Sequence, residues 1–412
     1  MRIDPAGVLL GGFGLAAGLA LPLVTVAPNR LVSGQGVSLW AVGQRLGPQL
    51  EQVTGQDAWV ADVSSTALAL ALALVVTSLL MLSLIAFWRK AAMGPDDMTV
   101  ALGVALIPAL LLLAGRYALH ISQNESTLSR TALGSGFWVM VLVVWLAVSS
   151  ALQRLRAGWA LGAGVRAVIA GCVLAALALG WCDQLSLMRE FANHADTLGA
   201  AVLRHVQIVV LTLLPALCIG LPLGWMVNRS TRLRQWLLPP LNVIQTIPSI
   251  ALFGLLMVPL AWAAQAWPGL AAMGVSGIGL APAVVALTLY SLLPVVRGTQ
   301  AGLAQVPGAV LDAARGMGMG SAQMFWHAQL PLAAPVILAG IRTATIQTVG
   351  LAAVAALVGA GGLGAIMFDG LFGSAQDLVL LGVLPIVGLA VLLDLGFEVL
   401  NRLAHVRTGG TV

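Results

Sequence analysis

Long apolar runs constrain this chain more than any other feature of its sequence. An α-helix rises about 1.5 Å per residue, so about 20 apolar residues cross the roughly 30 Å hydrocarbon layer of a bilayer. Ten runs reach roughly that length, and each is dominated by Leu, Ala, Val and Gly. The predicted spanning helices cover residues 7–27, 65–88, 98–115, 134–152, 164–182, 200–226, 237–260, 279–298, 333–358 and 378–401.

Composition agrees with this prediction. Only 8% of the residues are charged and 59% are hydrophobic, whereas a soluble domain carries about 25% charged residues. The first run follows Arg2, as in a signal peptide, but Asp4 and the length of the run favour a spanning helix. We therefore expect an all-α integral membrane protein with about ten transmembrane helices.

The distribution of basic residues predicts the orientation of the chain. With a cytoplasmic N-terminus, fourteen of the 20 Lys and Arg residues fall in cytoplasmic segments and six in outer segments. This asymmetry follows the positive-inside rule, so we expect both termini in the cytoplasm. The net charge of +5 is interpreted as an orientation signal, and no nucleic-acid partner is expected.

The chain divides near residue 196 into two halves of different character. Residues 1–196 contain five predicted spans with few polar side chains, whereas residues 197–405 carry proline and polar residues inside the spans. In hydrocarbon, a broken helix is tolerated only where its backbone faces protein or a watery cavity. The second half therefore predicts a transport path, although prolines that merely kink packed helices remain an alternative. Candidate lining residues are Gln245, Pro248, Ser249, Tyr290, Thr345 and Gln347.

One polar segment, Asp312–Pro331, lies between two predicted spans. It is too polar and too rich in glycine to cross a bilayer. The pattern predicts a short helix, a break at Gly316–Gly320 and a second helical piece that ends at Pro331. The predicted orientation places it in a cytoplasmic loop that covers residues 299–332.

Several chemistries find no support in the sequence. The single lysine, Lys90, is not part of a Gly-rich phosphate-binding loop, so we expect no ATPase site and no bound cofactor on this chain. The five histidines lack metal-ligand spacing, and no catalytic arrangement stands out. Intramembrane carboxylates, which mark ion-coupled carriers, are nearly absent. Asp394 and Glu398 lie near the inner end of the last span, where we expect them to be solvated.

The segment Asp312–Pro331 resembles the EAA motif of ABC-importer permeases, in which Glu-Ala-Ala precedes a Gly and a Leu-Pro pair at fixed spacing. The matching residues are Asp312, Ala313, Ala314, Gly318, Leu330 and Pro331. Two positions depart from the motif, because Asp312 replaces Glu and Ala328 replaces Ile.

Further runs resemble the osmoprotectant branch of these permeases, which serves importers of glycine betaine, choline and carnitine. They are residues 244–249, 289–294, 314–319, 339–343 and 358–364. The resemblance covers about residues 197–405. Residues 1–196 resemble, less distinctively, the N-terminal extension of low-affinity glycine betaine uptake permeases.

The resemblance implies a type I importer core of five spans behind a multi-span extension, in a bacterial inner membrane. It implies three kinds of partner: cytoplasmic ABC ATPase subunits that bind Mg-ATP, a second permease copy or paralogue, and a periplasmic substrate-binding protein. It also implies that the six matched motif residues couple the permease to the ATPase. An ABC permease for an amino acid or another small solute, an ion-coupled secondary carrier and a non-transporting scaffold remain alternatives.

Overall fold

The structure is a computed structural model that describes residues 12, 14, 16–18, 20–29, 32, 34–46, 94–124, 128–156 and 158–407. The chain divides into two compact units, Met1–Ala192 and Asn193–Val412. Among the described residues, eight helices are long and apolar enough to cross a membrane. The prediction of a helical, multi-span membrane protein is therefore confirmed, and the predicted span 65–88 lies outside the described residues.

The first unit contains a small antiparallel sheet that the sequence did not predict. Its strand order is β2–β1–β3, formed by Gln35–Ser38, Pro22–Ala27 and Arg130–Leu133. The predicted span 7–27 is therefore wrong over its last six residues. Pro22 cannot donate a helical hydrogen bond, and the β-branched run Val24–Val26 packs well in a strand that has partners on both sides.

Five described helices accompany this sheet in the first unit. They are α2 (Leu39–Leu46), α5 (Pro95–Asn124), α6 (Ser135–Arg154), α7 (Trp159–Ala178) and α8 (Ser186–Asn193). Helix α5 is longer than the predicted span 98–115. Asp96 and Asp97 occupy its first turn, where negative charge suits the helix dipole.

Charged side chains fasten α8 to the sheet. Arg189 donates to the carbonyl oxygen of Ser129 at 3.0 Å, and the guanidinium of Arg130 lies 3.8 Å from the carboxylate of Glu190. Burial, and then the charge of Arg130, lower the pKa of Arg189. The sheet and α8 therefore form one packed structure.

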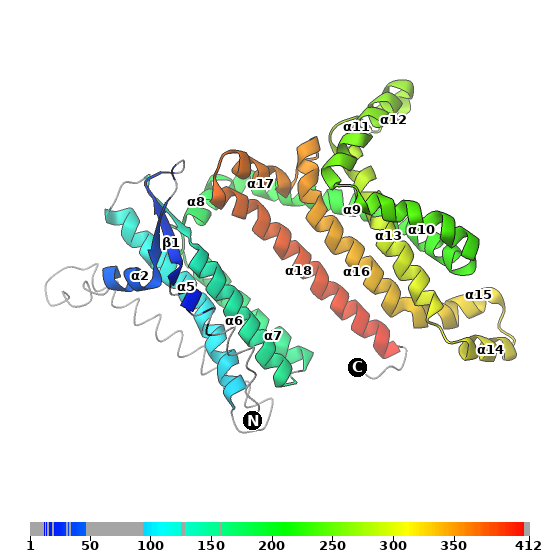
Figure 1. Ribbon diagram of the computed structural model, residues 1–412, viewed down its shortest axis with the longest axis horizontal. Coiled ribbons are helices and arrows are strands. Elements are labelled where there is room, and N and C mark those ends of the chain that lie inside the picture. The colour runs from blue at the N-terminus through cyan, green and yellow to red at the C-terminus, as the bar shows by residue number, and fades with distance from the viewer. Residues whose placement is uncertain are drawn as a thin grey trace. The chain divides into compact units, whose positions relative to one another are not determined.

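The second unit is built from α-helices with two short irregular turns. They are α9 (Ala195–Arg229), α10 (Thr231–Thr246), α11 (Ser249–Ala266), α12 (Pro268–Ala272), α13 (Leu280–Ala304), α14 (Gly308–Gly316), α15 (Ser321–Met324), the π-helical turn η1 (Phe325–Gln329), α16 (Leu330–Val354), the 3₁₀ turn η2 (Ala355–Val358), α17 (Leu363–Phe372) and α18 (Gln376–Arg407). Figure 1 shows α13, α16 and α18 running side by side.

Helix α13 lies at the centre of this unit because glycines let its neighbours approach closely. A Cβ added at Gly224 of α9 would lie 2.5 Å from the Cβ of Thr299 and 2.8 Å from the carbonyl oxygen of Val296. A Cβ added at Gly302 of α13 would lie 2.8 Å from the carbonyl oxygen of Ala333 on α16. Small residues allow this backbone contact, which stabilises helix pairs in membranes through van der Waals packing.

The predicted span 237–260 is wrong, because the chain breaks at Ile247–Pro248. Proline removes an N–H group and forces the preceding residue out of the helical region, and Ile247 accordingly has a ψ of 129°. The helix long enough to span is α11. The other C-terminal spans were located correctly, with α13 and α18 extending several residues beyond the predicted ends.

The close packing at Gly224 predicts a specific stability effect. Gly224→Ala places a methyl group against Thr299 and Val296, and overpacking of this kind costs about 1–3 kcal/mol. We expect a lower melting temperature in detergent, measured by thermal unfolding. Gly254→Ala in α11 is the matched control, since its Cβ meets nothing within 4 Å. Equal melting temperatures for the two variants would contradict the packing argument.

Candidate functional site

The polar segment predicted to couple to an ATPase forms a helix that ends in a glycine turn. Helix α14 ends at Gly316, and Gly318 adopts a φ of +80°, which favours glycine. The N–H of Gly318 donates to the carbonyl of Arg315 at 2.9 Å, and the N–H of Met319 donates to the carbonyl of Ala314 at 3.1 Å. This pair of hydrogen bonds is a Schellman motif. The backbone of the turn therefore explains why the segment has glycine at position 318.

The segment does not end at Pro331 as predicted. Helix α15 continues through η1 into α16, and residues Ser321–Val358 form one apolar helical stretch. A proline at position 331 lacks the N–H group that would bond to the carbonyl of residue 327, and its ring clashes there in a regular helix. The wider π turn at Phe325–Gln329, in which Leu330 N–H bonds to Phe325 O, avoids this clash.

The outer surface of α14 combines an ion pair with small and apolar side chains. Arg315 donates to Asp312 at 2.8 Å, and the Asp312 side chain remains 75% exposed. Ala313 is exposed, whereas Ala314 is buried. Met317 is also exposed. The exposed surface of α14 and its C-cap therefore combines an ion pair, the small side chain of Ala313 and the long apolar side chain of Met317.

The base of the segment packs on the bundle through an apolar cluster. Its buried members are Leu303, Val306, Ala333 and Ile337, and its partly buried members are Leu221, Trp225, Leu311, Phe325, Leu330 and Ile341. These residues come from α9, α13, α14, η1 and α16, except Val306, which lies in the connection between α13 and α14. Leu330, one of the predicted motif residues, therefore contributes to the anchor rather than to the exposed surface.

Two of the predicted path residues, Gln245 and Tyr290, meet where two helices are interrupted. Pro294 has no N–H to donate to the carbonyl of Tyr290, four residues earlier in α13. The side-chain amide of Gln245 on α10 donates to that carbonyl oxygen at 2.8 Å. In return, the hydroxyl of Tyr290 donates to the carbonyl oxygen of Ile247, at the break between α10 and α11. Each side chain thus satisfies a backbone group that the other helix leaves free.

The remaining predicted path residues have different environments. Pro248 and Ser249 lie at the break itself, where Pro248 is the N-cap of α11. Thr345 is buried on α16 and donates to the carbonyl of Ile341 in its own helix at 2.9 Å. Gln347 is partly buried, and its amide makes no hydrogen bond to the residues that the structure describes. Four of the six predicted residues therefore cluster at the break, while the other two lie on α16.

Sequence reasoning missed a second polar contact beside this break. The hydroxyls of Ser291 on α13 and Thr348 on α16 are 2.8 Å apart, and both residues are buried. Ser291 directly follows Tyr290 in the sequence, and this neighbouring position was the feature from which the contact could have been predicted. Together the two contacts form a polar layer across α10, α13 and α16.

A salt bridge between α16 and α18 was also missed. Arg342 forms a two-pronged contact with Asp394, with Nε–Oδ1 and Nη2–Oδ2 distances of 2.6 and 2.7 Å. One turn further along α18, Arg402 donates to Glu398 at 2.9 Å. Both carboxylates keep about a third of their side-chain surface exposed, 36% for Asp394 and 32% for Glu398. The expectation that they are solvated is therefore not contradicted, but it did not include their arginine partners.

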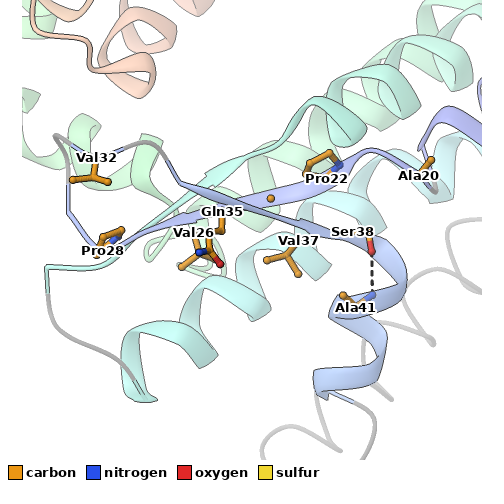
Figure 2. Close-up of a pocket in the computed structure, with 10 residues that line it drawn as sticks. Ala20, Pro22, Val26, Pro28, Val32, Gln35, Val37, Ser38 and Ala41 are labelled. Carbon is orange, nitrogen blue, oxygen red and sulfur yellow. Dashed lines mark hydrogen bonds between the residues drawn. The ribbon is translucent and has the colours of Figure 1, made fainter.

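The first unit contains a cavity of about 640 Å³ beside its sheet. Figure 2 shows Val26, Gln35 and Val37 among its lining side chains, with Ser38 and Ala41 joined by a hydrogen bond. None of its lining residues is titratable. Among the described residues of the whole chain, no group of His, Cys, Asp and Glu side chains could hold a metal ion. The described residues therefore give no geometry for acid–base or metal chemistry.

Comparison with protein families assigns the two halves separately. Residues 216–406 match the family described as the binding-protein-dependent transport system inner membrane component. Residues 4–51 and 52–188 match the N-terminal domain of the ABC transporter permease YehY. The two matches fall on the two compact units.

Curated relatives match about half of this chain. The osmoprotectant import permease protein OsmW of Salmonella typhimurium is 40% identical over 216 residues, which are 52% of this chain and 94% of OsmW. The glycine betaine/carnitine/choline transport system permease protein OpuCD of Bacillus subtilis is 34% identical over 53% of this chain and 90% of OpuCD. A solved chain of the MetNI methionine ABC transporter aligns with a TM-score of 0.44 at 24% identity, over 50% of this chain and 95% of that chain.

The hydrogen bond from Gln245 to the Tyr290 carbonyl predicts a stability effect that depends on the presence of Pro294. Gln245→Leu leaves the Tyr290 carbonyl without its donor, and a hydrogen bond between membrane helices is worth about 0.5–2 kcal/mol. Pro294→Ala restores the missing N–H in α13. We therefore expect Gln245→Leu to lower the melting temperature in the wild-type background and much less in the Pro294→Ala background.

Thr246→Ala provides the control for this cycle, because Thr246 is exposed and bonds only within its own helix, to Val243. Its effect should be the same in both backgrounds. An equal cost of Gln245→Leu with and without Pro294 would show that the amide does not replace the missing backbone bond.

Proposed function

Since this chain belongs to the family of permease subunits of binding-protein-dependent ABC importers, we propose that it forms the membrane path for glycine betaine or a related quaternary-ammonium osmoprotectant. The observation that carries the substrate class is the match to 94% of an osmoprotectant import permease at 40% identity. Relatives named for glycine betaine, choline and carnitine transport support the same class. The family match at residues 216–406 falls in the C-terminal unit, so that unit is the proposed transport core.

The geometry of the second unit supports a path through its centre. Gln245, Tyr290, Pro248 and Ser249 gather at an interrupted helix, and interrupted helices in membranes border protein or water-filled cavities. Backbone and hydroxyl dipoles at such a site suit a cationic solute without demanding tight binding. High-affinity recognition of a quaternary ammonium group relies on aromatic cages, which we assign to a separate periplasmic binding protein.

We assign ATPase coupling to the loop 299–332. Helix α14 presents Asp312 and Ala313 on an exposed surface, while Gly318 allows the chain to turn back toward α16. The six matched residues then divide into two roles: Asp312 and Ala313 contact the partner, whereas Ala314, Gly318, Leu330 and Pro331 shape the loop.

The proposed assembly places ATP chemistry on other chains. Cytoplasmic ABC ATPase subunits bind Mg-ATP, and closure of their dimer moves the paired loops and switches the cores between inward-facing and outward-facing states. A second permease, identical or paralogous, completes the path in the bacterial inner membrane, with both termini of this chain in the cytoplasm. Coupling of this kind requires no cofactor on the permease itself.

The substrate assignment is tested with the full complex reconstituted in liposomes. We expect ATP-dependent uptake of radiolabelled glycine betaine, choline or carnitine in the presence of the binding protein. Methionine and histidine serve as competitors. Uptake of an amino acid without uptake of any of the three quaternary-ammonium solutes would contradict the proposed substrate class. Uptake driven by an ion gradient without ATP would contradict the importer mechanism.

The coupling loop is tested by Gly318→Ala. An alanine at a φ of +80° costs about 1 kcal/mol or more and disturbs the turn that orients α14, so we expect substrate-stimulated ATP hydrolysis to fall while membrane insertion is unchanged. Gly274→Ala is the matched control. Gly274 also has a positive φ and open space around it, but it lies between α12 and α13. Equal loss of hydrolysis in both variants would contradict the assignment.

A further inference from the structure

Three aromatic rings connect the exposed surface of the loop 299–332 with helix α9. The rings of Trp326 and Phe325 are 5.4 Å apart and meet edge to face. Phe325 in turn meets Trp225 of α9 edge to face, at 6.3 Å and 77°. The first ring of this series is 63% exposed, whereas the last lies within the packed base of the segment.

The far end of the series is fixed within α9, because Arg229 lies one turn after Trp225 on the same helix. The guanidinium of Arg229 lies 4.2 Å from the centre of the Trp225 ring, a cation–π contact. Gly224, the neighbour of Trp225, is pressed against Thr299 and Val296 of α13. Trp225 therefore lies on the part of α9 that packs most closely on α13.

The connectivity of the chain makes this contact important. The loop continues directly into α13 on one side and into α16 on the other, so force on the loop reaches those helices through covalent bonds. Helix α9 is distant in sequence and meets the base of the loop through side chains alone, of which Trp225 and Leu221 belong to the apolar cluster. Trp225 contacts η1 directly, through the edge-to-face contact between its ring and that of Phe325.

The π turn affects how the aromatic rings are oriented relative to α16. One extra residue in a turn rotates the side chains at its start by about 100° around the helix axis relative to those that follow it, since a regular turn has 3.6 residues. In η1, Phe325 faces the cluster at the base of the segment, and the next residue, Trp326, faces outward. Pro331 therefore affects the loop indirectly, by imposing the turn from which Phe325 projects.

We infer that Phe325 and Trp225 are positioning residues that transmit movement of the loop to α9, with Trp326 as the exposed end of the series. This inference rests on the proposed importer function and extends it to residues outside the matched motif. The aromatic pair lets the loop pull on α9 at the same moment as on α13 and α16, so that the three helices change state together.

The test measures the number of substrate molecules transported per ATP hydrolysed by the reconstituted complex. Aromatic pairs contribute a free energy that corresponds to roughly a threefold to tenfold change in an equilibrium, so we expect Phe325→Leu to lower this ratio by about that factor. Trp225→Leu should lower it to a similar extent, and the double variant should be no worse than either single variant. Phe325→Tyr, which keeps the ring, should restore the ratio.

Phe368→Leu is the matched control, because Phe368 stacks on Phe372 within α17 and does not belong to the loop. It should leave the transport ratio unchanged. A normal ratio in Phe325→Leu, or a parallel loss of hydrolysis and transport that leaves the ratio constant, would overturn the inference. If the wild-type complex fails to couple uptake of a quaternary ammonium solute to ATP hydrolysis, the proposed function falls first and the inference falls with it.

Discussion

The C-terminal unit depends on satisfying backbone groups that prolines leave free inside a membrane. Water cannot supply a donor in hydrocarbon, so each freed carbonyl needs a protein partner. At Pro294 the partner is the Gln245 amide, and at the Ile247 break it is the Tyr290 hydroxyl. Because each interruption supplies the partner of the other, two hydrogen bonds join α13 to the C-terminal end of α10, directly before α11 begins.

Close packing confines flexibility to such interruptions. Two glycine pairs have members four residues apart: Gly220 and Gly224 of α9 face α13, and Gly298 and Gly302 of α13 face α16. Helices that touch backbone to backbone have no layer of side chains that could yield, so they move as bodies. A change between two states then has to occur where the helices are broken or where a loop joins them, which are the places where the polar layer and the aromatic series lie.

Hydropathy located most spans because the composition of each span is a local property. Hydropathy failed where a single residue, such as a proline, ends a helix inside a stretch of apolar composition. Residues 237–260 are apolar enough on average to pass as one span, although Asn242, Gln245 and Thr246 precede the break. An average therefore hides the break, even though Pro248 was recognised as a candidate path residue. The strand Pro22–Ala27 was missed for another reason, since its pairing with Arg130–Leu133 joins segments about a hundred residues apart.

Side-chain partners were harder to predict than the residues themselves. Gln245 and Tyr290 were both identified from the sequence. The two hydrogen bonds between their segments, however, depend on Pro294 lying four residues after Tyr290 and on the register of α10 against α13. The sequence shows only that Asp394 lies near the inner end of its predicted span, and that position led to the expectation of a solvated carboxylate. The arginine that pairs with it lies 52 positions earlier, on another helix.

The motif Asp312–Pro331 shows why a resemblance with departures still describes the same loop. Gly318 and Pro331 determine backbone shape, the first through its left-handed conformation and the second through the π turn before it. Both are present. The departure at Asp312 falls on a side chain that is 75% exposed, and Ala328 lies within the π turn that Pro331 already imposes. The departures therefore fall on one exposed and one partly buried position, and neither residue has the positive φ or the proline ring that would determine the course of the backbone.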